Sequence, residues 1–253
     1  MTIFAFVRRD RAALGFLGGC LLSLLAAAPA GAFQIVAISQ DFEPTGRGAN
    51  QTFQVENDRD EVVTVTIAMA LRKVDIDGKE TLVPTEDFTV FPTEIVLQPK
   101  ASRVVRAKWM GDPSPTSELA YRIIAEETPL NVRRETPGAS VFLTVRYVGS
   151  IYIVPKGGRA DVVVASAQAA RNAQGQPQLD LVLENKGSRH AILDAPSVTV
   201  TAGGVSKTLD KAAIDKALTG ENILARTQRR VVFPWPSGLP VGAVQAQVKY
   251  SVQ

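Results

Sequence analysis

Apolar and polar residues alternate in short runs along most of this chain. Alternation with a period of two residues is typical of β-strands that bury one face. Gly, Pro, Asn and Asp separate the runs, as turns do between neighbouring strands. The pattern predicts strands at FQIVAIS (33–39), QTFQVEN (51–57), VVTVTIAMAL (62–71), FTVFPTEIVL (88–97), SRVVRAKW (102–109), AYRIIAEE (120–127), DVVVASAQ (161–168), QLDLVLEN (178–185), SVTVTA (197–202), RRVVFPW (229–235) and AVQAQVKYSV (243–252).

About seven short strands per hundred residues are typical of an immunoglobulin-like sandwich. Two stretches in the first half of the chain resemble two in the second half, in the same order: residues 51–65 with 178–192, and 94–109 with 221–235. We therefore predict an all-β fold of two tandem immunoglobulin-like β-sandwich domains that arose by duplication. We place them at 33–155 and 159–253, joined by the turn Pro155–Arg159. The one helix we expect is a short loop helix at 208–218.

One alternating run, at residues 140–154, is longer than a sandwich needs. Ordinary strands have about 5–6 residues, whereas this one would span roughly 45–50 Å at ~3.4 Å per residue. Either it is a core strand of a large sandwich, or it offers surplus apolar edge to a partner. Its apolar face is made of the odd-numbered residues Val141, Leu143, Val145, Tyr147, Gly149, Ile151 and Ile153.

The first 32 residues have the pattern of a secretory signal peptide. Three arginines precede an apolar run that ends in small residues. The pattern places cleavage after Ala30-Gly31-Ala32, with Ala28-Pro29-Ala30 as the alternative, and we expect an exported protein. Other readings are an uncleaved membrane anchor, twin-arginine export through Arg8-Arg9, and lipidation of Cys20.

Removal of this segment changes the charge and the cysteine content. The remaining chain keeps 25 of its 28 basic and 24 of its 25 acidic residues, so its net charge does not indicate nucleic-acid binding. The only cysteine is lost, which leaves no disulfide and makes the fold depend on packing. We expect no nucleic-acid partner.

The polar residues do not form a recognisable catalytic or metal-binding pattern. His190 is the only histidine, and no nucleophile is indicated near it. Asp75–Glu80 weakly resembles a calcium loop, but an Asp-Gly hairpin turn accounts for it better. Lys156–Arg159 lacks the Lys-Ser/Thr pair of a phosphate loop and is expected to be a linker. We therefore predict a protein that is not an enzyme and has no cofactor and no metal.

Three segments together resemble the periplasmic chaperones of chaperone–usher pilus assembly. They are FQVEND (53–58), VFPTEIVLQPKASRVVRAKW (90–109) and ELAYRIIAEETPL (118–130), and the resemblance extends over most of residues 33–250. It implies a periplasmic chaperone whose two domains form an L or boomerang. Such a protein would bind pilus (fimbrial) subunits and deliver them to an outer-membrane usher.

The resemblance also implies roles for single residues. In that family the long strand completes the fold of a subunit by β-augmentation. Aligned on Pro155, Val141, Leu143 and Val145 match the donor residues, and Tyr147 continues their face.

The family anchors the subunit's terminal carboxylate with a cleft Arg and Lys, but this chain has Asp41 and Ser150 at those positions. Arg146 and Lys156 are the candidate cleft cations, and a self-capping homodimer is left open. The rival interpretation is an exported adhesion or structural module of two sandwiches that holds no client.

Overall fold

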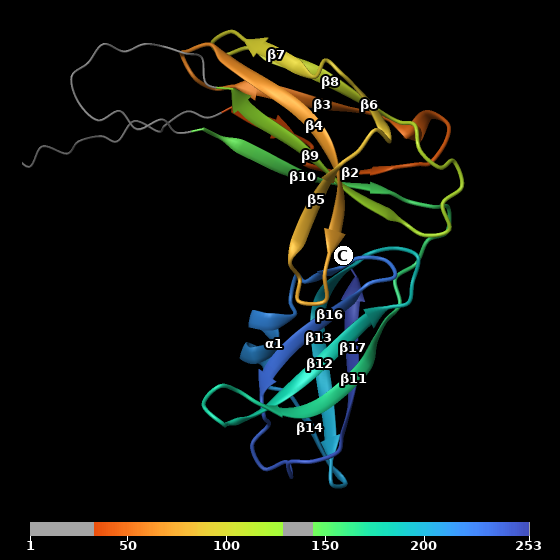
Figure 1. Ribbon diagram of the computed structural model, residues 1–253, viewed down its shortest axis with the longest axis vertical. Coiled ribbons are helices and arrows are strands. Elements are labelled where there is room, and N and C mark those ends of the chain that lie inside the picture. The colour runs from red at the N-terminus through yellow and green to blue at the C-terminus, as the bar shows by residue number, and fades with distance from the viewer. Residues whose placement is uncertain (1–32, 129–143, 253) are drawn as a thin grey trace, which may run out of the picture. The chain divides into compact units, whose positions relative to one another are not determined.

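The computed structural model describes residues 33–128 and 144–252 (Figure 1). The predicted signal peptide and the predicted donor residues Val141 and Leu143 lie outside these ranges. The predicted all-β fold is confirmed: the described chain consists of strands with one α-helix and one short 3-10 helix. Among the described residues, no helix is long and apolar enough to cross a membrane.

Two sheets of the first sandwich enclose one hydrophobic core. The first sheet has the order β1-β3-β8-β6, and the second has the order β2-β10-β9-β4-β5, with β7 paired to β4 (Figure 1). Phe53, Val55 and Leu97 are fully buried between them. The strands are β1 (Phe33–Val36), β2 (Ser39–Phe42), β3 (Asn50–Asn57), β4 (Val63–Val74), β5 (Glu80–Pro84), β6 (Phe88–Phe91), β7 (Glu94–Leu97), β8 (Ser102–Trp109), β9 (Leu119–Thr128) and β10 (Arg146–Ile153), with the 3-10 helix η1 at Arg47–Ala49.

Two predicted strands are each divided between the two sheets. FQIVAIS breaks at Ala37, whose φ of 63° does not fit a strand, so that β1 pairs with β3 and β2 pairs with β10. FTVFPTEIVL breaks at Pro92, which cannot donate a ladder hydrogen bond; β6 then pairs with β8 and β7 with β4. Both predictions of a single strand were therefore wrong.

The second sandwich has its own buried core, in which Leu181 and Leu193 are fully buried. Its sheets have the orders β11-β12-β16 and β14-β13-β15, and β17 also pairs with β13. The elements are β11 (Val162–Arg171), β12 (Pro177–Asn185), β13 (Ala191–Ala202), β14 (Val205–Thr208), α1 (Lys211–Ala217), β15 (Asn222–Ile223), β16 (Gln228–Pro234) and β17 (Val244–Val252). The helix begins later than predicted, because Asp210 caps its first turn by accepting two backbone hydrogen bonds.

The repeated segments take similar positions in the two sandwiches. β3 and β12 each end in a fully buried asparagine, Asn57 and Asn185, whose amide bonds backbone groups of neighbouring turns. The segments 94–109 and 221–235 each end in a tryptophan whose indole donates to a backbone carbonyl a few residues later. Trp109 donates to Asp112, and Trp235 donates to Leu239. These shared contacts support duplication.

The predicted Asp-Gly hairpin is confirmed between β4 and β5. The carboxylate of Asp75 accepts hydrogen bonds from the backbone N–H groups of Asp77 and Lys79, and Gly78 supplies the positive φ of 82° that the turn requires. The carboxylate therefore serves the turn itself.

Candidate functional site

One side of β10 is only partly covered by other strands. β9 pairs with β10 along its whole length, from Arg146 to Ile153. On the other side, β2 covers only Ser150–Ile153, because the chain before Ile38 turns away to the opposite sheet. Residues 146–149 therefore form an open strand edge with respect to every strand that the structure describes.

The backbone groups at this edge alternate. The carbonyl of Val145 accepts a hydrogen bond from the N–H of Glu127 in β9, so the odd-numbered residues bond toward β9. The N–H of Ser150 donates in the opposite direction, to the carbonyl of Ile38, at 2.7 Å. By the same alternation, the N–H and C=O groups of Arg146 and Val148 face the open edge. These are the groups that an added strand would bond.

Gly149 marks the point where β2 meets β10. A Cβ atom at this position would lie 2.4 Å from the carbonyl oxygen of Ile38, so only glycine allows the two backbones to approach this closely. Ile38 and Val148 lie next to this crossing in sequence, and both side chains are exposed. The open edge therefore has exposed apolar side chains beside its free backbone groups.

The predicted donor residues that the structure describes pack on their own domain. Val145 and Tyr147 are half-buried against the first core, and the Tyr147 ring meets that of Phe33 edge to face at 5.0 Å. The described strand, β10, has eight residues, Arg146–Ile153, and Thr144 and Val145 precede it outside any strand, so the predicted length over 140–154 is not confirmed. The donor roles of Val141, Leu143, Val145 and Tyr147 stay predictions.

The candidate cleft cations lie apart. Arg146 is exposed and pairs with Glu126 across the ladder at 3.4 Å. Lys156 is exposed in the turn after β10 and lines a hollow of about 670 Å³ together with Asp41. Among the described residues no contact joins these two cations, and their role also stays a prediction.

Two arginines, Arg72 and Arg122, form a cluster with Glu80 next to the side chain of Ser150. Arg122 is opposite Ser150 in the β9–β10 register, and its Nη1 donates to Ser150 Oγ at 2.5 Å. The same guanidinium donates two hydrogen bonds to Glu80, at 3.0 and 2.6 Å. Arg72 on β4 donates to Glu80 at 2.7 Å. Two arginines thus share one carboxylate, which gives the cluster a net positive charge.

Little solvent reaches this cluster. The side chains of Arg72, Arg122 and Glu80 are 11%, 17% and 27% exposed. The hydrogen bond from Arg122 holds the pKa of the Glu80 carboxyl below its ordinary value, and the charges of both arginines act in the same direction against the effect of burial. Glu80 is therefore a stable counter-ion for one of the two positive charges.

Two hydroxyl groups on β10 extend the cluster. Ser150 Oγ accepts from Arg122, and Tyr152 Oη accepts from Asn222 at 2.8 Å and from Arg72 at 3.5 Å. Neither hydroxyl has a carboxylate or carbonyl acceptor for its own proton among the described residues. Tyr152 is buried, whereas Ser150 is half-buried, so a second anion beside Ser150 would meet its O–H donor and one uncompensated positive charge.

Asp41, the other position that the resemblance assigns to a cation, also has an arginine beside it. The carboxylate of Asp41 on β2 pairs with Arg189, which precedes β13, at 2.6 Å. Arg189 comes from the second sandwich and is about half exposed. An arginine from another element thus contacts each of the two positions, Asp41 and Ser150, that the resemblance assigns to cations.

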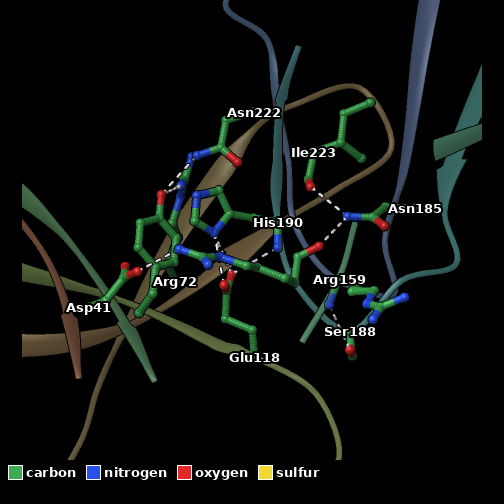
Figure 2. A network of polar contacts seen from close by, with 11 residues as sticks. Asp41, Arg72, Glu118, Arg159, Asn185, Ser188, His190, Asn222 and Ile223 are labelled. Carbon is green, nitrogen blue, oxygen red and sulfur yellow. Dashed lines mark hydrogen bonds and ion pairs between the residues drawn. The ribbon is translucent and has the colours of Figure 1, made fainter. Parts of the chain in front are cut away.

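His190 is also held by this network. Its Nδ1 lies 2.8 Å from both carboxylate oxygens of Glu118, whose side chain is 1% exposed (Figure 2). The imidazole ring stacks on Tyr152 with the ring centroids 4.0 Å apart. These contacts give His190 a structural place between the segment before β9 and the segment before β13. No group of three or more His, Cys, Asp or Glu residues in the described ranges is placed to hold a metal ion.

Sequence reasoning missed Arg72, Glu80, Arg122 and Arg189. Arg122 lies within the segment ELAYRIIAEETPL, but only the pairing register shows that it faces Ser150. The strand β5, which carries Glu80, was not predicted at all. Arg189 lies 148 residues from Asp41 in the chain, so no local pattern connects them.

Comparison with known proteins finds solved structures that have the same fold. No protein-family model and no curated protein sequence matches the chain. Among solved structures, the class 5 fimbriae chaperone CfaA is 17% identical with a TM-score of 0.52, over 88% of this chain and 100% of that one.

Two further structures agree. A chain of the chaperone–tip adhesin complex of CFA/I fimbriae biogenesis is 17% identical, with a TM-score of 0.54 over 86% of this chain and 98% of that one. A chain of the CsuC–CsuE chaperone–tip adhesion subunit complex from Csu pili of Acinetobacter baumannii is 15% identical, with a TM-score of 0.53 over 79% and 89%. The chain thus has the two-sandwich fold of the fimbrial chaperones.

Proposed function

We propose that the protein is a periplasmic chaperone that binds pilus subunits by donor-strand complementation and delivers them to an outer-membrane usher. The observation that carries this proposal is the open edge of β10 at residues 146–149, which leads directly into the predicted donor residues. Structures with this fold include chaperones in complex with tip subunits, and this supports the choice of client.

The edge has the chemistry that strand addition needs. The N–H and C=O groups of Arg146 and Val148 would bond the main chain of the client, and alternate side chains would fill its groove. Each buried donor side chain contributes roughly 1.5–3 kcal/mol before the cost of ordering. Val141, Leu143 and Val145 are the proposed donors, with Tyr147 continuing the face.

We further propose that the arginine cluster takes the place of the missing cleft cations. A client carboxylate beside Ser150 would meet its hydroxyl proton and the positive charge that Glu80 leaves uncompensated. In this arrangement Arg122 supplies, from the neighbouring strand, the charge that a lysine at position 150 would supply.

The edge can be tested without disturbing the core. Proline at position 148 removes only an outward-facing N–H and so blocks strand addition, whereas Val148→Thr keeps the N–H and the branched shape. Tagged protein would be purified from periplasmic extract while candidate pilus subunits are expressed, and the eluted complexes weighed by intact mass spectrometry.

The proposal predicts a stoichiometric small subunit with the wild type and with Val148→Thr, and none with Val148→Pro, while circular dichroism shows all three folded. Wild-type protein recovered alone would contradict the chaperone role and support the adhesion module. A subunit retained equally by Val148→Pro would show that clients bind elsewhere.

A further inference from the structure

The outer face of the first sheet carries the most exposed large apolar side chain of the described chain. Phe91, on the edge strand β6, is 75% exposed. It lies beside Arg106 in the β6–β8 register and helps to line a hollow of about 470 Å³ with Arg106 and Lys108. Val104, on the same face of β8, is 52% exposed. In Figure 1, β6 lies beside β8 in the upper part of the view.

Neither cation of this face has a counter-ion among the residues that the structure describes. Arg106 lies between Thr52 and Phe91 in the register, and Lys108 lies between Asn50 and Thr89, all of them uncharged. The structure gives neither cation an ion pair or a side-chain hydrogen bond within the described ranges.

The nearest acid on the neighbouring strand is already engaged. Glu56 lies toward the other end of β3, where its carboxylate accepts hydrogen bonds from Gln34 and Gln54. Arg106 and Lys108 are both exposed on the solvent side of β8, so neither packs in the core.

An exposed aromatic ring flanked by two unpaired cations can bind a partner that is both apolar and acidic. The alkyl stems of arginine and lysine provide apolar walls while their charged ends remain at the rim. A hollow built in this way can accept one apolar side chain and pair with acidic residues on either side of it. Exposed apolar side chains of this kind commonly mark interaction sites.

We propose that this face, defined by Phe91, Val104, Arg106 and Lys108, binds an acidic protein segment that carries an exposed apolar side chain. It belongs to the sheet β1-β3-β8-β6, whereas the open edge of β10 belongs to the opposite sheet. The face and the open edge are therefore separate surfaces of the first sandwich. This inference does not depend on the proposed function.

The test uses fluorescein-labelled hexapeptides and the whole exported chain, read by fluorescence anisotropy. The peptide EDFLDE should bind saturably, and EDSSDE, which has the charge without the apolar pair, should bind at least tenfold more weakly. Phe91→Ser and Arg106→Glu should each weaken binding of EDFLDE at least tenfold. Lys249→Glu, an exposed cation on β17, is the matched control and should leave the affinity unchanged.

Reversing the charge of this face tests whether its cations select the acidic peptide. The double variant Arg106→Glu with Lys108→Glu should lose EDFLDE and gain binding of KKFLKK, with thermal melting showing that the fold is kept. No saturable binding of EDFLDE, or equal binding by Phe91→Ser, would overturn the proposal. Equal affinity for an oligonucleotide of the same charge would also overturn it, because the face would then be a general polyanion site. Unchanged peptide binding by Val148→Pro would show that this face is separate from the client edge.

Discussion

Arg122 and Ser150 face each other across the β9–β10 ladder, and the guanidinium donates a hydrogen bond to the serine hydroxyl at 2.5 Å. Chaperones of the family that the sequence resembles have a lysine at the position of Ser150. In the proposed function, Arg122 supplies this positive charge from the next strand. The exchange would leave β10 free of a buried charge, and Glu80 holds the arginine in position.

If Arg122 supplies the charge of the missing lysine, a lysine at position 150 should compensate for the loss of Arg122. Arg122→Gln should weaken client binding at least tenfold, because the client carboxylate loses its charged donor. Adding Ser150→Lys to Arg122→Gln should restore most of the affinity by returning the cation to β10. The affinities would be measured by calorimetry with a purified subunit and with the same subunit lacking its terminal residues. Equal affinity of Arg122→Gln and the wild type would show that the anchor lies elsewhere, while leaving the role of the β10 edge intact.

Glu80 should stabilise the fold in a pH-dependent way. Glu80→Gln removes the carboxylate that Arg72 and Arg122 share, so we expect the free energy of unfolding at pH 7 to fall by about 1.5–3 kcal/mol. The pKa of Glu80 is lower in the folded protein than its ordinary value of 4.5. Its contribution is therefore complete above about pH 4.5 and is lost as the pH falls through the lower folded value.

Urea unfolding at a series of pH values checks this. The difference between the wild type and Glu80→Gln should be constant from pH 7 to 5 and shrink below pH 4.5. Glu86→Gln, at an exposed carboxylate, serves as the control with little effect. A difference that persists unchanged to pH 3 would mean that packing, and not charge, accounts for it.

Gly149→Ala should loosen the crossing of β2 over β10. The added methyl group would lie 2.4 Å from the carbonyl oxygen of Ile38, and relief requires a backbone shift that costs about 1–3 kcal/mol. Gly242→Ala, where no atom lies within 4 Å of the added carbon, should change stability little. Thermal unfolding measures both, and equal melting temperatures for the two variants would contradict the close approach.

Replacement of either buried asparagine should lower the stability of the protein by the same amount. Asn57→Ala and Asn185→Ala each leave several buried backbone groups without their partner, so each should destabilise the protein by about 3 kcal/mol. Asn50→Ala, at an exposed asparagine with one long hydrogen bond of 3.4 Å, is the control. A loss below 1 kcal/mol at only one of the two buried sites would argue against equivalent roles in the two sandwiches.

Alternation of apolar residues predicted most strands, because each strand buries one face in a sandwich core. The breaks at Ala37 and Pro92 were missed for different reasons. An alanine with positive φ leaves no mark in a hydrophobic pattern, and a proline between two apolar runs is compatible with one edge strand. Both breaks depend on which sheet each half joins, and this is a tertiary property.

The candidate site was predicted only in part. The strand β10 was recognisable because its alternation is local, while its predicted extension before Arg146 stays a prediction. The cluster around Arg122 was not, since it requires the register of β9 and β10 and a hairpin that brings Glu80 back beside β4. Pairs such as Asp41 with Arg189 join residues far apart in the chain and follow only from the folded structure.

The most direct measurement is residue-resolved amide hydrogen exchange along β10, in the free protein and in a complex co-purified with a pilus subunit. The N–H groups of Arg146 and Val148 face the open edge, and those of Tyr147 and Gly149 bond toward β9. We predict fast exchange at Arg146 and Val148 in the free protein, strong protection of both in the complex, and slow exchange at Tyr147 and Gly149 in both states. Unchanged fast exchange at Arg146 and Val148 in the complex would contradict donor-strand complementation at this edge.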